Sequence, residues 1–134
     1  MYSQTADKLV RIPALLYGLF LLGVATAGFC GFATILGVFE TTTFHNLIHI
    51  FLGVLLVLSS IYSARNTRLV GAFLAALYLL TGILGWLDVL ETNQALLRAL
   101  VETTALGTYL RVISGVGIVT LLWFTSSARS YIND

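Results

Sequence analysis

Four stretches of this chain contain no aspartate, glutamate, lysine or arginine, and together they cover most of its 134 residues. They are residues 12–39, 41–64, 69–87 and 112–128, and the shortest is 17 residues long. A helix needs about 20 mostly apolar residues to cross a bilayer core of about 30 Å. Hydrocarbon offers no partners to unpaired backbone groups, so the segments that cross it must be helices. The sequence therefore predicts an all-α membrane protein with four transmembrane helices.

The composition argues against a water-soluble domain. Of the residues, 58% are hydrophobic and 10% are charged, whereas soluble domains are about 25% charged. The net charge is +1 and no basic patch is present, so a nucleic-acid partner is not expected. Cys30 is the only cysteine, and its apolar neighbours in the sequence predict a buried, inert thiol.

The expected spans are residues 12–36, 46–63, 69–87 and 106–125, within a single domain covering 1–134. Only a short basic link separates the second span from the third, so these two must form an antiparallel hairpin. We therefore expect an antiparallel bundle built from two helix hairpins. Four aromatic residues lie near the expected span ends, where their rings suit the headgroup level: Tyr17, Trp86, Trp123 and Tyr131.

Charged residues separate by sign between the two ends of the expected bundle. One end carries five basic residues: Lys8, Arg11, Arg65, Arg68 and Arg129. The other end carries four acidic residues and two basic ones: Glu40, Asp88, Glu91, Glu102, Arg98 and Arg111. The positive-inside rule then predicts a multi-pass protein of the cytoplasmic (inner) membrane with both termini in the cytoplasm.

The connection between the third and fourth spans has helical periodicity over about residues 93–103. Its apolar stripe is Leu96, Leu97, Leu100 and Val101, and its polar face is Gln94, Arg98 and Glu102. This pattern predicts a short amphipathic helix on the outer membrane surface. The alternatives are a loop or an early start of the fourth span.

Small residues recur every four positions in two spans. They are Gly23, Ala27 and Gly31 in the first span, and Gly71 and Ala75 in the third. Small residues at this spacing let helix backbones approach closely in lipid. The pattern predicts helix packing, either inside the bundle or between copies.

His45 and His49 are the only histidines, and their spacing places both on one helix face near its outer end. Such a pair can bind a metal, although zinc needs further ligands, for which Glu40, Asp88, Glu91 and Glu102 are available. His49 alone could be the axial ligand of a chlorophyll-type tetrapyrrole, whereas a bis-histidine haem would need a homodimer. The alternative is that His45 lies at the headgroup level and His49 bonds a neighbouring helix.

Arg111 is expected over a turn into the fourth span, at the depth of His49. An ionisable group at this depth is costly and tends to be paired. Glu102, Asp88 and Glu40 are candidate partners, and the alternative is that Arg111 snorkels to the outer headgroups. Asn46, Arg111 and Glu102 are thus candidates for a polar cluster at the outer side.

Two short segments suggest an internal repeat. Residues 49–54 align with 111–116, and residues 21–23 align more loosely with 80–82. If the repeat is real, His49 and Arg111 occupy equivalent positions in two hairpins and would face each other.

The chain also resembles a known family. The motifs that carry the resemblance are Gly28-Phe29, 36–39, the histidine segment 45–53 and the segment 77–85. They are similar to those of the bacterial four-helix membrane family named domain of unknown function 4383. The family usually repeats the Asn46 and His49 pattern in its last span, where this chain has Thr108 and Arg111 instead. The resemblance implies a four-helix membrane fold and implies no particular activity.

No sequence motif indicates an enzyme: no nucleophile with its base and no phosphate-binding loop is present. The sequence therefore favours a non-catalytic accessory or stabilising subunit that acts through helix contacts with other membrane subunits or with itself. Two alternatives remain open, a metal or tetrapyrrole binder using His49, and a homo-oligomeric channel or carrier for a small neutral solute. No cofactor is favoured, and the lipid bilayer is expected to surround the four spans.

Overall fold

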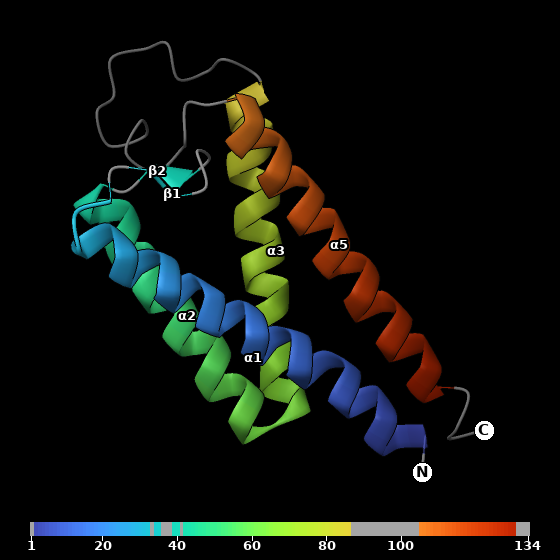
Figure 1. Ribbon diagram of the computed structural model, residues 1–134. Coiled ribbons are helices and arrows are strands. Elements are labelled where there is room, and N and C mark those ends of the chain that lie inside the picture. Colours follow the sequence, from blue (N-terminus) through green and yellow to red (C-terminus); the bar gives the residue numbers. More distant parts are fainter. Residues whose placement is uncertain (1, 33, 36–38, 41, 87–104, 131–134) are drawn as a thin grey trace.

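The computed structural model describes residues 2–32, 34, 35, 39, 40, 42–86 and 105–130. Its helices are α1 (Tyr2–Phe29), α2 (Thr43–Tyr62), α3 (Ala64–Trp86) and α5 (Ala105–Ser130) (Figure 1). All four are long and apolar enough to cross a membrane. This confirms the predicted all-helical, four-span fold class. The segment expected to form an amphipathic helix, residues 93–103, lies outside the described residues.

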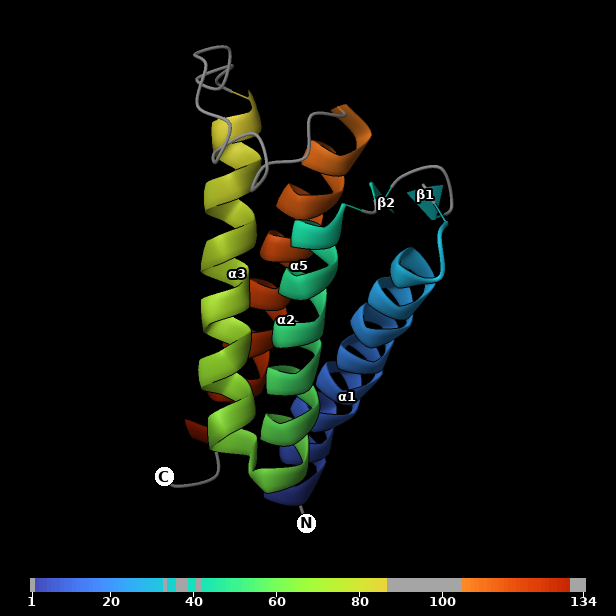
Figure 2. The same cartoon turned by 90° about the vertical axis from the view of Figure 1, so that its left-hand side faces the viewer.

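The helices lie together in two pairs, α1 with α2 and α3 with α5 (Figures 1 and 2). In the first pair, Arg11 of α1 contacts the end of α2, and Gly28 of α1 contacts the start of α2. In the second, Gly82 near the end of α3 packs on Val112 near the start of α5. The two members of each pair therefore run in opposite directions. The start of α1 and the end of α5 lie at the end of the bundle where α2 meets α3 (Figure 1).

The first helix ends at Phe29, seven residues before the position expected from hydropathy. Gly31 has φ +96°, a left-handed conformation that suits glycine. The N–H of Gly31 donates to the Gly28 carbonyl, and that of Phe32 donates to the Ala27 carbonyl. These two bonds form a Schellman cap, which ends the helix although the following residues are still apolar. Two short strands follow, β1 (Thr34–Ile35) and β2 (Phe39–Glu40), which pair antiparallel.

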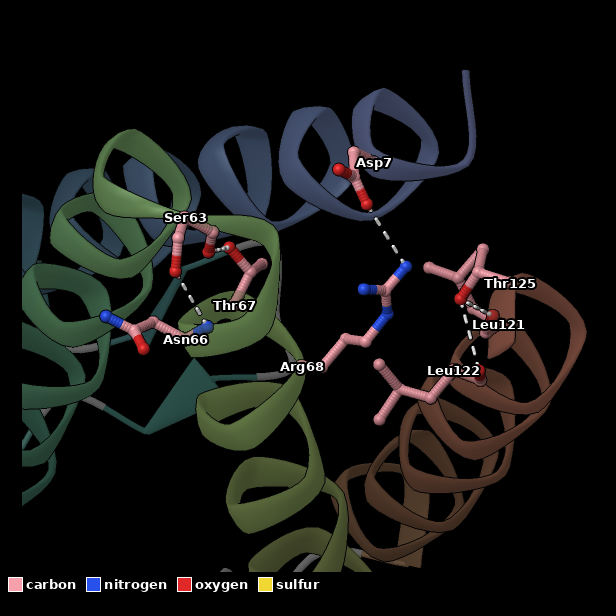
Figure 3. A network of polar contacts seen from close by, with 8 residues as sticks. All are labelled: Asp7, Ser63, Asn66, Thr67, Arg68, Leu121, Leu122 and Thr125. Atoms are coloured by element: carbon pink, nitrogen blue, oxygen red, sulfur yellow. Dashed lines mark hydrogen bonds and ion pairs between the residues drawn. The ribbon is translucent and has the colours of Figure 1, made fainter. Parts of the chain in front are cut away.

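A single residue, Ser63, separates α2 from α3. Its N–H donates to the Ser59 carbonyl, and its hydroxyl accepts the N–H of Asn66, so it satisfies backbone groups of both helices (Figure 3). The hydroxyl of Thr67 also donates to the Ser59 and Ser63 carbonyls. The short basic link expected between the two spans, residues 64–68, is therefore the first turn of α3, because hydroxyl groups replace the missing helical hydrogen bonds.

Four leucines form the centre of the apolar core: Leu21 of α1, Leu52 and Leu56 of α2, and Leu74 of α3. In an apolar stretch of 18 residues in α2, 39% of the stretch is buried inside the bundle, whereas in the corresponding stretch of α5 the share is 17%. The second helix is therefore the central one, and most of α5 faces outward.

Candidate functional site

A pair of tyrosines joins the two helix pairs. The hydroxyl oxygens of Tyr17 on α1 and Tyr78 on α3 are 2.6 Å apart, and their rings meet edge to face with centroids 6.4 Å apart. A tyrosine buried in a membrane protein brings a hydroxyl group that needs a partner. Here each hydroxyl group provides that partner for the other.

Arg111 and His49 approach the same region from the two remaining helices. The positive charge of Arg111 on α5 lies close enough to act electrostatically on both Tyr17 and His49 of α2. Both Arg111 and His49 are half-buried. We call Tyr17, His49, Tyr78 and Arg111 the four-helix polar cluster, since each helix contributes one member.

The sequence indicated two members of this cluster and missed the other two. The proposed repeat pointed to His49 and Arg111 as facing residues. Tyr17 was expected at a headgroup level, but α1 begins at Tyr2, so Tyr17 lies in the middle of the helix. Tyr17 and Tyr78 are 61 positions apart, close to the repeat spacing, and this was the signal that could have identified them.

His45 and Asn46 serve the start of α2. Thr42 is the N-cap: its hydroxyl accepts the N–H of His45 and lies 2.8 Å from Nδ1 of the same histidine. Asn46 is 2% exposed, and its amide packs directly on the backbone of Gly28. Asn46 therefore packs the start of α2 against the end of α1, and the buried His45 is held beside the N-cap of its own helix.

The predicted metal site gains no support from the residues that can be placed. Within the described part of the chain, no group of three or more His, Cys, Asp or Glu side chains could hold a metal ion. The further ligands expected for it, Asp88, Glu91 and Glu102, lie outside the described residues, as does the side chain of Glu40. A metal or tetrapyrrole on His49 thus stays a prediction, as does the role of Glu102 in a polar cluster.

One face of α1 carries small residues that point away from the bundle. A Cβ atom added to Gly23 would meet no atom of the described residues within 4 Å. Thr26 and Cys30 are exposed and Ala27 is half-buried. Thr26 and Ala27 follow Gly23 by three and four positions, so these three residues share one helix face, and Cys30 follows directly after the helix end. We call Gly23, Thr26 and Ala27 the α1 small face.

Two expectations for this region differ from the structure. Gly31, the last member of the predicted small-residue stripe, lies beyond the helix end and caps it. Cys30 was expected to be buried but is exposed, because the helix ends at the preceding residue.

A double-mutant cycle tests the tyrosine pair. We expect Tyr17→Phe and Tyr78→Phe to be coupled by about 0.6 kcal/mol, the average for hydrogen bonds between membrane helices. The free energies of unfolding of the two single variants and the double variant, measured in detergent micelles, give this coupling. Strictly additive losses would show that the two hydroxyl groups do not bond.

The family described as "Domain of unknown function (DUF4383)" has a model that matches residues 11–124. The match covers most of the chain, and the chain belongs to this family. No curated protein and no solved structure matches it.

Proposed function

We propose that this member of the DUF4383 family is a non-catalytic accessory subunit of a membrane complex. It associates with neighbouring transmembrane helices through the α1 small face. The observation that carries the proposal is the open space around Gly23, in a bundle whose other glycines are mostly used for close packing.

The contrast among the glycines supports an outside partner. At five glycines an added Cβ would come within 3.0 Å of another helix of the same chain: Gly18, Gly28, Gly53, Gly82 and Gly115. A glycine inside a helix costs about 1 kcal/mol relative to alanine. No contact within the described bundle accounts for that cost at Gly23 or at Gly117, but only Gly23 has small residues both three and four positions after it, Thr26 and Ala27. A helix from another subunit, packed closely against the small residues, accounts for it.

The polar groups support a structural role rather than catalysis. The hydroxyl groups of Tyr17 and Tyr78 bond each other, and a ring nitrogen of His45 is bonded by Thr42. The tyrosine pair joins α1 to α3, and the Thr42–His45 contact caps α2. Both support the bundle that presents the α1 small face.

Native purification tests the proposal. The tagged protein is extracted in mild detergent, and co-purifying proteins are quantified for wild type and for Gly23→Leu. We expect a stoichiometric partner, or a second copy, whose recovery falls about tenfold in Gly23→Leu, equivalent to about 1.4 kcal/mol. Gly117→Leu on α5 is the matched control, since an added Cβ there also meets nothing. An isolated wild-type monomer, or equal losses in both variants, would contradict the proposal.

We also propose that both termini face the cytoplasm, in the inner membrane. Arg11, Arg65 and Arg68 lie at the end of the bundle that holds both termini, which supports this orientation. Cys30 lies at the opposite end and is the only cysteine. A membrane-impermeant maleimide should therefore label it in intact cells, with Cys30→Ser as the unlabelled control. Labelling seen only in inside-out vesicles would reverse the orientation.

A further inference from the structure

A second surface feature is a groove between α3 and α5, separate from the four-helix polar cluster. The groove has a volume of about 680 Å³. Its α3 side includes three alanines, Ala72, Ala75 and Ala76, and its α5 side includes Val119, Leu122 and Trp123. Alanines leave room beside the α3 backbone, so the groove can accept a slender apolar chain lying along the two helices.

Two arginines, Arg65 and Arg68, line the groove at the start of α3. Arg65 is exposed, and no hydrogen bond or ion pair engages it within the described residues. The Arg68 side chain is 18% exposed, and it pairs with Asp7 through one nitrogen at 3.4 Å (Figure 3). Its Nε is buried, with no partner among the described residues. Five N–H donors are available on a guanidinium group, so Arg68 can bind a second anion.

The position of these arginines is unfavourable for the helix itself. The N-terminal end of a helix carries a partial positive charge, which favours acidic residues and disfavours basic ones. The first turn of α3 contains no acidic residue, and Arg65 and Arg68 stand at its start. Asp7 neutralises only one of the two positive charges. An external anion at this place would relieve the surplus.

We propose that the groove holds an anionic phospholipid, with its phosphate on Arg65 and Arg68 and an acyl chain between α3 and α5. Basic pockets between transmembrane helices on the cytoplasmic side are suited to acidic headgroups. Trp123 lines the same groove and is 69% exposed, as suits a ring at the edge of a lipid site. The surplus charge selects an acidic lipid over a zwitterionic one, and the apolar groove selects a lipid over free phosphate.

Lipid titration of the purified full chain tests this proposal. Binding of phosphatidylglycerol and of phosphatidylcholine with the same acyl chains is followed by native mass spectrometry, and inorganic phosphate serves as a third probe. We expect phosphatidylglycerol to bind at least about fivefold more tightly than phosphatidylcholine, the effect of one basic residue near the surface. We expect inorganic phosphate not to compete.

Three variants separate a built site from general attraction. Arg65→Gln should weaken phosphatidylglycerol binding about fivefold, and Ala76→Phe should weaken it by filling the groove without changing the charge. Lys8→Gln removes an exposed positive charge from the same end of the bundle, outside the groove, and should have no effect. Equal binding of the two lipids, full competition by phosphate, or an equal loss in Lys8→Gln would each overturn the proposal.

Discussion

Replacing Gly53 with valine is expected to destabilise the protein by about 1–3 kcal/mol, the usual cost of overpacking a close contact. A Cβ atom at Gly53 would lie 2.8 Å from Cγ of Leu22 and 2.9 Å from the carbonyl oxygen of Gly18. One of these neighbours is backbone and cannot rotate away. The two helices of the first pair would have to separate, and the contacts of Leu21 with Leu52 and Leu56 would weaken with them.

The matched control for Gly53→Val is Gly117→Val. Both substitutions replace a helical glycine with the same β-branched residue, so their intrinsic effects on helix formation are alike. At Gly117 an added Cβ atom would meet none of the described residues within 4 Å. Unfolding by heat or by SDS in mixed micelles should therefore leave Gly117→Val close to wild type. If both variants unfold at the same detergent fraction, α1 and α2 are not packed backbone to backbone.

Arg11 is expected to give the second large effect, because it closes the end of α2. Its Nε donates to the Ser60 carbonyl at 2.6 Å, and one terminal nitrogen donates to the Ile61 carbonyl at 2.9 Å. These carbonyls belong to the last turn of α2, whose last four carbonyls have no partner within the helix. Arg11→Met, which keeps the apolar stem, should cost about 1.5–3 kcal/mol, the usual value for one hydrogen bond to a charged group.

Arg11→Lys distinguishes the guanidinium geometry from charge alone. An ammonium group keeps the positive charge but cannot reach two carbonyls as a planar fork does. We expect Arg11→Lys to fall between wild type and Arg11→Met in its free energy of unfolding. Lys8→Met removes a nearby exposed charge and should be neutral. A loss in Lys8→Met as large as that in Arg11→Met would assign the effect to net charge instead of the cap.

The four spans could be predicted from the sequence because charged residues are nearly absent from them, and this property needs no tertiary information. The helix ends could not be read in the same way. The first helix ends at a Schellman cap formed around Gly31, within an apolar run that hydropathy alone extends. The second helix ends at Tyr62, one residue from the end of the expected span, but the third begins at Ala64 and not at residue 69, because Ser63 bonds backbone groups of both helices.

For the candidate site, the suggested repeat pointed to His49 and Arg111 as facing residues, and Arg111 lies close enough to act electrostatically on His49; the repeat itself stays a prediction. Tyr17 was missed because a tyrosine near an expected span end usually anchors at the headgroups. The spacing of the small residues could not show whether they pack inside the bundle or against another molecule, since both kinds of packing use the same spacing. Only the surroundings of each glycine distinguish Gly18, where an added Cβ would meet α2, from Gly23, where it would meet none of the described residues.

The proposed role rests on what lies against the α1 small face, and photo-crosslinking in native membranes reports this directly. A photoreactive residue is placed at Thr26, on that face, and separately at Thr120 on α5. Both threonines are exposed, and each hydroxyl bonds the carbonyl four residues earlier in its own helix, so the two positions are closely matched. We expect a protein adduct of defined size from position 26 and only lipid adducts from position 120. Lipid adducts alone from position 26 would contradict the account.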